Sequence, residues 1–325
     1  MTIKKIVSNR NFEKRSWWDI VYKWEDIISK ELSLPIKPLN IIQFGFQIFQ
    51  NFFNKALPLN IQPNNLRFVM TARPKFYGEF GRQDIPIIID FFLSDNKAID
   101  FLNTVKKQKI VLISSKEVYD YLINIGGNSH QIKHWALSLP DELAITPQTK
   151  FEKKYDLVLI GRLPKTFQNY VDKYRERHPS FSIVTKRVED GAFNYYDSSG
   201  NYVGNANDYQ GYIDILRKSR IYLYTTPGLD SDKKTNGFSQ VTPRFLEVVS
   251  AGCNIIMHYP KNSDTDYFEL PKFGRSIQTY EEFEESVEEA LKCEPDMKFR
   301  SEYLQKHYTS VRSQELKNIL NYDLK

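Results

Sequence analysis

Residues 235–257 read TNGFSQVTPRFLEVVSAGCNIIM, and they contain the signals of a turn, a short helix and a strand in immediate succession. Thr242 suits an N-cap, Pro243 suits the first helical position, and Gly252 suits the stop that follows a helix. The apolar run after Gly252 is typical of a buried strand. The stretch therefore predicts a helix over residues 243–251 that leads into a strand, which is one step of a βα alternation.

The same alternation extends outward through both halves of the chain. Short runs rich in Ile and Val are typical of strands buried on both faces of a parallel sheet. Such runs occupy residues 40–43, 66–70, 85–89 and 109–113 in the first half, and residues 155–160, 182–184, 221–224 and 254–257 in the second. Helical periodicity occurs at residues 116–125, 166–177 and 209–219. Residues 191–208, polar and aromatic, indicate a loop or a hairpin insertion. The order of elements predicts an α/β protein.

A segment without sustained periodicity, residues 134–154, contains Pro140 and Pro147 and separates the two series. The length of 325 residues is close to the size expected for two domains. We expect two Rossmann-like domains, residues 1–145 and residues 146–325, with the last helix crossing back to the first domain. Because open α/β sheets bind ligands beyond the carboxyl ends of their strands, we expect the site in a central cleft that both domains face.

Composition and short motifs exclude several classes of protein. Hydrophobic residues make up 41% of the chain and charged residues 26%, so the chain can bury sizeable cores. No apolar run reaches the ~18 residues of a spanning helix and the N-terminus lacks a signal-peptide core, so we expect a cytoplasmic protein. The two cysteines form no CxxC pair, which argues against zinc ribbons and disulfide scaffolds. Neither GxGxxG after an early strand nor GxxxxGK[ST] is present, which argues against dehydrogenases and P-loop kinases.

The charge balance points to an anionic small molecule rather than to nucleic acid. The net charge of +5 is a mild excess of 45 basic over 40 acidic residues, with both signs mixed along most of the chain. Nucleic-acid binders usually concentrate Lys and Arg on one stripe, so we expect no nucleic-acid partner. A mild positive excess still favours anionic ligands.

The expected 243–251 helix carries the residues that best suit such a ligand. Arg244 lies in its first turn, where free backbone N–H groups and the helix dipole favour a phosphate. Glu247 lies on the same face, and a carboxylate there could accept hydrogen bonds from ribose hydroxyls. A turn that contains Gly237 precedes them and lets backbone approach a ligand closely. The alternatives are an ordinary surface ion pair worth ~0.2–0.5 kcal/mol and a simple loop.

Three segments together resemble a known family. They are YDLVLIGRLPK from Tyr155, a strand that ends at Tyr224-Thr225-Thr226-Pro227, and NGFSQVTPRFLEVVSAGCNII from Asn236. They look like the C-terminal half of GT-B glycosyltransferases of the broad glycosyltransferase group 1 superfamily, in particular its spore-protein-like branch. The tail HYTSVRSQELKNIL from His307 is similar to the closing segment of that branch. The resemblance covers the chain from about Tyr155 to its end.

The resemblance implies a set of donor-binding residues in the C-terminal domain. Glu247 would bind the donor ribose and Arg244 would approach the diphosphate. Gly161 and Arg162 would match the Gly-Arg after the first strand of the donor domain, and Lys165 the phosphate-binding Lys. The set is completed by Thr226, Gly237, Phe238 and Ser239. The chain departs from the family at Ser239, where the first Glu of the family's Glu pair stands, and at Lys165, which follows Arg162 more closely than expected.

The N-terminal domain is expected to bind the acceptor and to supply a general base. Asp90 directly follows the expected 85–89 strand, and the two phenylalanines after it provide apolar surroundings that would raise its pKa. The alternative for Asp90 is a helix cap. Glu79, in the glycine-bearing stretch FYGEFGRQD, is a competing candidate for catalysis. His130 and His134 lie near the seam and could act as neutral bases, although a lone His is usually structural.

These residues predict a glycosyltransferase of GT-B architecture that moves a sugar from a nucleotide-sugar donor to a carbohydrate or lipid-linked saccharide acceptor, in surface polysaccharide or glycoconjugate biosynthesis. We expect no metal and no cofactor besides the nucleotide-diphosphate sugar co-substrate, because Arg162, Lys165 and Arg244 can offset the charge of the leaving diphosphate. Asp230-Ser231-Asp232 has the spacing of a metal-binding DxD, but a solvated turn is the preferred interpretation. The alternatives are a sugar-nucleotide epimerase or hydrolase, and a non-catalytic nucleotide-sugar-binding protein of the same fold.

The N-terminal helix is expected to open at Ser16 with a variant of the capping box. Trp17, Val21, Trp24 and Ile28 then repeat at helical spacing, which is typical of a face packed on a core. The residues before the helix are basic, so the alternative is peripheral contact with the inner face of a membrane. An enzyme that uses a lipid-linked acceptor would need such contact.

Overall fold

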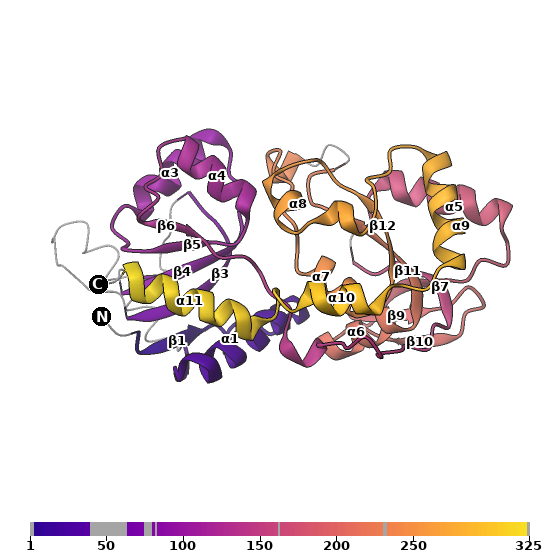
Figure 1. Cartoon of the computed structure of the whole chain (residues 1–325), viewed down its shortest axis with the longest axis horizontal. Coiled ribbons are helices and arrows are strands. Elements are labelled where there is room, and N and C mark those ends of the chain that lie inside the picture. The colour runs from indigo at the N-terminus through magenta and orange to yellow at the C-terminus, as the bar shows by residue number, and fades with distance from the viewer. Residues whose placement is uncertain are drawn as a thin grey trace. The chain divides into compact units, whose positions relative to one another are not determined.

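The computed structural model describes residues 3–39, 64–74, 80–81, 83–161, 163–229 and 233–323 (Figure 1). These residues form two compact α/β units. The N-terminal unit comprises Met1–Asp141, Lys233–Gln240 and Tyr308–Lys325, and the C-terminal unit comprises Glu142–Asp232 and Val241–His307. The chain therefore passes between the units several times. We call Lys233–Gln240, which returns to the N-terminal unit between two segments of the other, the bridging segment.

The N-terminal unit is built on a parallel sheet with the strand order β2-β1-β3-β4-β5-β6. Its strands are β1 (Lys5–Ser8), β2 (Ile36–Pro38), β3 (Asn65–Thr71), β4 (Asp84–Asp90), β5 (Val111–Ile113) and β6 (Ile132–His134). Its helices are α1 (Asp19–Leu32), α3 (Asp95–Val105), α4 (Lys116–Asn124) and α11 (Thr309–Asp323), with a 3-10 turn η1 (Ser16–Trp18) before α1.

Helices cover both faces of this sheet. Ile85, Ile87 and Ile89 of β4 pack into one core cluster with residues of α1 and α11. Ile88 points the other way and packs with residues of α3 and α4. Figure 1 shows the two helix pairs on opposite sides of the strands. Because successive side chains of a strand alternate between faces, a strand buried on both faces is apolar between its ends, as residues 85–89 of β4 are.

The C-terminal unit has a mixed sheet with the order β10-β9-β8-β7-β11-β12. The strands β7 (Tyr155–Val158), β8 (Ile183–Glu189), β11 (Ser219–Thr225) and β12 (Asn254–His258) are parallel, while β9 (Ala192–Tyr196) and β10 (Tyr202–Asn205) run antiparallel at one edge. The helices are α5 (Lys165–Arg177), α6 (Tyr209–Arg217), α7 (Arg244–Ser250), α8 (Ser263–Tyr267), α9 (Tyr280–Lys292) and α10 (Met297–Leu304).

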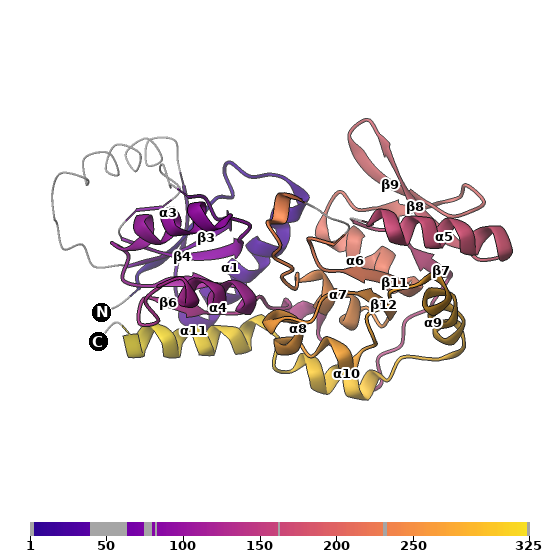
Figure 2. The same cartoon turned by 90° about the horizontal axis from the view of Figure 1, so that it is seen from above.

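The two faces of this sheet are also divided between helices. Ile221 and Leu223 of β11 pack in a cluster with residues of α5 and α9. Tyr224, on the other face, packs its ring 5.4 Å from that of Phe245 in α7. Figure 2 shows the β8–β9 ribbon extending away from the helices, so residues 191–208 form the hairpin alternative of the two predicted. The α/β class with two Rossmann-like units is confirmed.

The start of the first helix differs from its prediction. Ser16 opens the turn η1, and α1 begins at Asp19 with Trp18 as N-cap and without a side-chain cap. The 3-10 turn places Trp17 outside the register of the helix, and its side chain is 52% exposed. Val21, Trp24 and Ile28 are buried as predicted. The strand predicted at residues 40–43 lies outside the described residues.

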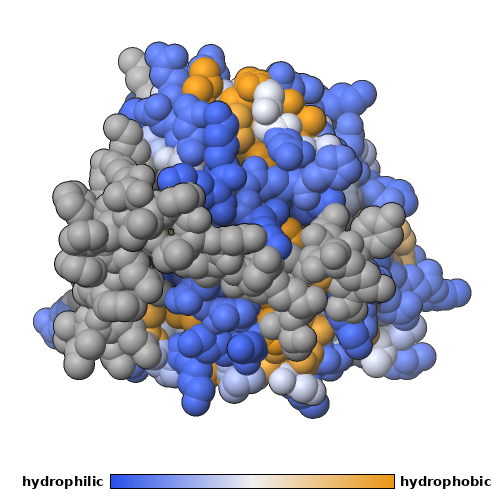
Figure 3. Space-filling view, turned by 90° about the vertical axis from the view of Figure 1, so that its left-hand side faces the viewer, coloured by the Kyte–Doolittle hydropathy of each residue, from blue (hydrophilic) through white to orange (hydrophobic). Residues whose placement is uncertain are grey.

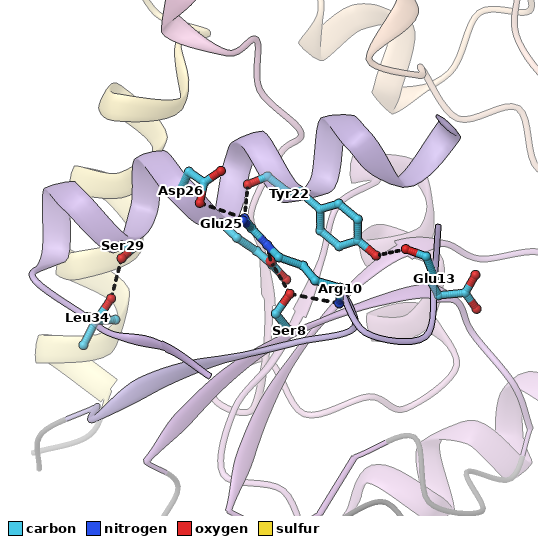
Figure 4. A network of polar contacts seen from close by, with 8 residues as sticks. All are labelled: Ser8, Arg10, Glu13, Tyr22, Glu25, Asp26, Ser29 and Leu34. Atoms are coloured by element: carbon cyan, nitrogen blue, oxygen red, sulfur yellow. Dashed lines mark hydrogen bonds and ion pairs between the residues drawn. The ribbon is translucent and has the colours of Figure 1, made fainter. Parts of the chain in front are cut away.

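A polar network fixes α1 to the end of β1 (Figure 4). The Ser8 hydroxyl donates to Glu25 Oε2 over 2.6 Å, and Arg10 Nε donates to the same oxygen over 3.1 Å. Arg10 Nη2 also donates to the Tyr22 carbonyl and to Asp26 Oδ1. Burial raises the pKa of Glu25 to about 7, which the contacts with Ser8 and Arg10 oppose. The network holds the loop after β1 against the helix.

The surface of the N-terminal unit that Figure 3 shows is mostly hydrophilic where it is described, with hydrophobic side chains in small separate groups. Among the described residues, no helix combines the length and the apolar character that a membrane span requires. The peripheral membrane contact and the cytoplasmic location stay predictions.

Candidate functional site

The short helix α7 begins at Arg244, and contacts from two other elements hold the turn that leads into it. The Val241 N–H donates to Asp264 Oδ2 over 3.0 Å, and the Thr242 N–H donates to the Tyr224 hydroxyl over 3.1 Å. The N-cap is Pro243, whose backbone is already helical, and no side chain caps the helix. The prediction that Thr242 is the N-cap is therefore wrong by one residue, because the helical conformation begins after it.

Two cations hold the other end of α7. Lys153 Nζ donates to the Ala251 carbonyl over 2.8 Å, and Arg300 Nη1 donates to the Val249 carbonyl over 3.3 Å. Burial lowers the pKa of Arg300 to about 10. Cations at a helix C-terminus satisfy carbonyls that lack helical partners. Neither contact could be predicted from the residues around α7, because both cations are distant from it in the chain.

Arg244 lies directly over Gly161, the glycine that follows β7 by a short loop. A Cβ atom built at Gly161 would lie 2.0 Å from Arg244 Nη1 and 2.5 Å from its Cζ. The backbone of Gly161 has φ +88°, a conformation that other residues rarely adopt. Gly161 is thus required twice, for its backbone conformation and for the space that the guanidinium fills. The structure brings these two predicted donor-binding residues into contact.

Tyrosines surround Arg244 and Glu247. The Tyr212 ring lies 5.8 Å from Arg244 Cζ, and the Tyr222 hydroxyl donates to the Ile160 carbonyl over 3.1 Å. Burial, followed by the charge of Glu247, raises the pKa of Tyr212 well above its usual value. The same two causes raise the pKa of Tyr209. Both phenols therefore remain neutral hydrogen-bond donors near the carboxylate.

Glu247 is a buried carboxylate in a polar setting. The residue is 5% exposed, and burial raises the pKa of its carboxyl, while the charge of Arg244 and the nearby hydroxyls of Tyr212 and Tyr209 lower it. Arg244 is half-buried, and its Nε–H finds no acceptor among the described residues. A guanidinium with an unused donor beside a carboxylate can bind a phosphate and a hydroxyl-bearing sugar at one place.

The remaining predicted donor-binding residues of the C-terminal unit contribute differently. Thr226 directly follows β11 and is 0% exposed, so it supports the strand end from inside. Lys165 is the first residue of α5 and is exposed. Arg162 and the DxD stretch at residues 230–232 lie outside the described residues.

Gly237, Phe238 and Ser239 belong to the bridging segment and hence to the N-terminal unit, whereas the sequence placed them in the C-terminal domain; their role in donor binding stays a prediction. The Phe238 side chain is 8% exposed and packs in the apolar cluster of α3 and α4. The Ser239 N–H donates to Glu117 Oε2 over 2.8 Å. The apolar partners of Phe238 explain this placement, because the ring is buried among them.

Asp90 stands at the end of β4, opposite Thr71 of β3. Gln240 Nε2 donates to its Oδ1 over 2.7 Å. Burial raises the pKa of Asp90 to about 6, and the hydrogen bond from Gln240 opposes that rise. The helix-cap alternative does not apply, because the N-cap of α3 is Ser94.

The other candidates for a general base are less suitable. Glu79 lies outside the described residues. His130 is exposed, and His134 ends β6. Burial, with the charges of Arg312 and Lys116, lowers the pKa of His134 to about 4. His134 is therefore neutral at physiological pH but a weak base.

Sequence reasoning missed the partners of the predicted residues more than the residues themselves. Tyr209 and Tyr212 are three residues apart on α6, so the sequence alone could have predicted that they lie on one face of the helix. Their position beside Glu247 could not be predicted, because it depends on how α6 and α7 pack. Nothing in the residues around Gln240 predicted that its side chain would contact Asp90.

Comparison of the sequence alone finds no matching family model and no matching curated protein. Comparison of the structure does find similar proteins. AviGT4, a glycosyltransferase involved in avilamycin A biosynthesis, is 9% identical with a TM-score of 0.54, over 100% of this chain and 98% of AviGT4. The UDP-GlcNAc 2-epimerase from Neisseria meningitidis bound to UDP-GlcNAc is 10% identical with a TM-score of 0.52, over 99% of this chain and 100% of the epimerase.

The pneumococcal O-GlcNAc transferase GtfA in complex with UDP and GlcNAc is 12% identical with a TM-score of 0.51. The similarity covers 87% of this chain, which spans 60% of the length of that transferase. This chain likewise spans 60% of the length of the protein that it matches in the GtfA/B complex. These similarities show that the protein has the GT-B fold, as the resemblance in sequence implied.

Proposed function

We propose that this protein is a glycosyltransferase that binds a nucleoside-diphosphate sugar in its C-terminal unit and transfers the sugar to a carbohydrate or lipid-linked saccharide acceptor. The observation that carries the proposal is the position of Arg244, over Gly161 and beside the buried carboxylate of Glu247. The acceptor would be a precursor of a surface polysaccharide or another glycoconjugate, in keeping with the resemblance of the C-terminal half. The co-substrate is the nucleotide sugar itself, and the proposal involves no metal.

Arg244 would stabilise the leaving group. Transfer breaks the bond between the anomeric carbon and the diphosphate oxygen, and the electron pair leaves with the diphosphate. The growing negative charge needs preorganised donors, and a guanidinium can offer two parallel N–H groups to one phosphate. Gly161 leaves the space for that guanidinium. The half-buried setting of Arg244 strengthens the interaction relative to water.

Glu247 would recognise the ribose. An ionised carboxylate is an acceptor only, and two neighbouring ribose hydroxyls are donors that match its oxygens. The charge of Arg244 and the hydroxyls of Tyr209 and Tyr212 favour the ionised form against burial. The pair therefore supports simultaneous recognition of the phosphate and of the sugar attached to it.

Asp90 would act as the general base. As the acceptor oxygen attacks the anomeric carbon, the hydroxyl proton would pass to the Asp90 carboxylate. A pKa of about 6 leaves Asp90 ionised at neutral pH and more basic than an ordinary aspartate. Only the ionised form accepts a proton, so activity should rise as the pH passes upward through about 6.

A second candidate function is epimerisation of the sugar while it stays attached to the nucleotide. The observation that favours it is the similarity to a UDP-GlcNAc 2-epimerase over nearly the full length of both chains. The nucleotide site would be the same, and no acceptor would be needed. A non-catalytic nucleotide-sugar-binding protein is the remaining alternative.

Incubation with a panel of UDP-, GDP- and CMP-sugars, with and without added saccharides, separates the three. Transfer releases the nucleotide in proportion to the acceptor, epimerisation changes the sugar without release, and a binder does neither. The proposal expects acceptor-dependent release, and a loss of about 10²-fold or more in Asp90→Asn. Acceptor-independent conversion, or wild-type release by Asp90→Asn, would contradict it. Asp95→Asn, on the exposed start of α3, is the matched control.

A further inference from the structure

The bridging segment is anchored to the N-terminal unit by several different contacts. The Phe238 ring packs 5.7 Å from Phe91 and 5.1 Å from Tyr121, edge to face in both cases. Asn236 Nδ2 donates to the Phe92 carbonyl over 2.6 Å. The segment is therefore a packed part of this unit, although its neighbours on both sides in the chain belong to the other.

Gln240, the last residue of the segment, has its side chain at the end of β4. The side chain is 1% exposed. Its Nε2 donates to Asp90 Oδ1 over 2.7 Å and to the Ile89 carbonyl over 3.3 Å, and its Oε1 accepts from the Phe91 N–H over 3.4 Å. One amide thus contacts three consecutive residues, and the shortest contact is the one with the carboxylate.

A purely structural role would explain only part of this arrangement. A buried amide must be hydrogen-bonded, and the two longer contacts with the backbone of Ile89 and Phe91 would serve that need. The contact with Asp90 does more, because it fixes the direction of one carboxylate oxygen and leaves the other for a second partner. It is also a hydrogen bond to a charged group, which is stronger than a neutral one.

We propose that Gln240 is a positioning residue, which holds the Asp90 carboxylate in the orientation that the general base needs. The proposal rests on the function proposed above, in which Asp90 takes the proton of the acceptor hydroxyl. Gln240 also precedes Val241 and Thr242, whose N–H groups are held by Asp264 and Tyr224 of the C-terminal unit. The base is therefore oriented by the same stretch of chain that leads into α7.

The charge state of Asp90 provides a test that needs no substrate. Burial raises its pKa to about 6 and the Gln240 hydrogen bond lowers it, and no charged group among the described residues is a further cause. An aspartate whose pKa is raised on folding gives stability below its unfolded pKa, and this stability is lost as pH rises through the folded pKa. Asn does not titrate, so the pH dependence of the difference in melting temperature between wild type and Asp90→Asn reports Asp90 alone.

The experiment measures this difference in two backgrounds, Gln240 and Gln240→Met. Met has a similar length and no N–H donor, so it should raise the pKa of Asp90. The difference changes between the unfolded pKa of about 4 and the folded pKa of about 6, so its midpoint should lie at about pH 5 with Gln240 and about half a pH unit higher with Gln240→Met. Gln240→Glu, which sets a second carboxylate beside Asp90, should move it further upward. Asn236→Gly removes a neighbouring anchor without touching Asp90 and should leave the midpoint unchanged.

A transfer assay with the donor found in the panel completes the test. Gln240→Met should lower kcat about 10-fold, leave the donor KM near wild type, and shift the acid limb of the pH profile in the same direction as the midpoint. An unchanged midpoint in Gln240→Met overturns the role of Gln240 whatever Asp90 does. If Gln240→Met shifts the midpoint but Asp90→Asn transfers sugar at the wild-type rate, Asp90 is not the general base. The hydrogen bond between Gln240 and Asp90 would then serve only the stability of the fold. If Gln240→Met does not fold, Gln240→Glu gives the same two readings.

Discussion

Glu247 lies where burial and a neighbouring cation act in opposite directions. Burial favours the neutral acid, and Arg244 with two tyrosine hydroxyls favours the carboxylate. A buried charge that loses its partner is strongly destabilising, so the pair depends on each member. Replacement of Glu247 by alanine would therefore affect the fold as well as the ligand. Glu247→Gln keeps the shape and removes the charge, which makes it the better variant for binding studies.

Gly161→Ala should displace Arg244. The new methyl group would collide with the guanidinium, because the Cβ position lies 2.0 Å from Nη1. The left-handed backbone adds a strain of about 1–2 kcal/mol. We expect UDP affinity, measured by calorimetric titration, to fall at least about 10-fold.

Gly200→Ala is the matched control for this substitution. Gly200 lies in the same unit with φ +85°, and no atom lies within 4 Å of its Cβ position. It should lose a similar amount of stability from backbone strain and keep its UDP affinity. Equal UDP affinity in the two variants would show that the contact of Gly161 with Arg244 does not matter for binding.

The bridging segment is the element whose place in the fold could not be predicted from the sequence. Its sequence reads as a glycine-containing turn, and the left-handed Asn236 and Gly237 agree with that. Phe238 is apolar, but the sequence does not show which core will bury it. The answer depends on Phe91 and Tyr121, which lie far from it in the chain. The residues of the bridging segment therefore predict its turn, but only its tertiary contacts show that it packs in the N-terminal unit.

Phe238→Ala should destabilise the protein without affecting the nucleotide site. Loss of a buried aromatic ring from a core costs about 3–5 kcal/mol, and the slight exposure of Phe238 places it near the lower value. Denaturant unfolding would measure the loss, while calorimetry with UDP should give wild-type affinity in the folded protein.

Phe12→Ala serves as the control, because Phe12 is in the same unit and 44% exposed. Its effect should stay within about 0.5 kcal/mol. If Phe238→Ala were as stable as Phe12→Ala, the bridging segment would not be packed as described. If Phe238→Ala instead lost UDP binding alone, the ring would be part of the donor site after all.

The two α/β units could be predicted because strands buried on both faces of a parallel sheet appear in the sequence as short continuous apolar runs. Ile85 to Ile89 must be apolar at every position, since one face of β4 meets α1 and α11 and the other meets α3 and α4. The strands β1, β2 and β6 were missed, because each has only three or four residues; β2 and β6 are the edge strands of the sheet. The hydrophobic pattern of a strand predicts which of its residues are buried, but it does not predict which residues they contact.

The candidate site was predictable to the same extent. Arg244 and Glu247 were predicted from helical spacing and from the resemblance, and Gly161 from the resemblance alone, which matches it to the family's Gly-Arg after the first strand of the donor domain. Their mutual contacts, and those with Tyr209 and Tyr212, join α6, α7 and the loop after β7 in the C-terminal unit, while Gln240 joins the bridging segment to β4 in the N-terminal unit. No periodicity records contacts between such distant segments, so only the folded chain shows them.

Binding of the nucleotide part of a sugar donor by the C-terminal unit is the central claim, and calorimetric titration with UDP, GDP and CMP tests it most directly. We predict that one of the three binds wild type, and that Glu247→Gln weakens this binding about 10- to 100-fold through lost hydrogen bonds to a charged group. Glu288→Gln, on the exposed face of α9, should bind as wild type does. Absence of binding by all three nucleotides, or equal affinity in wild type and Glu247→Gln, would contradict the account.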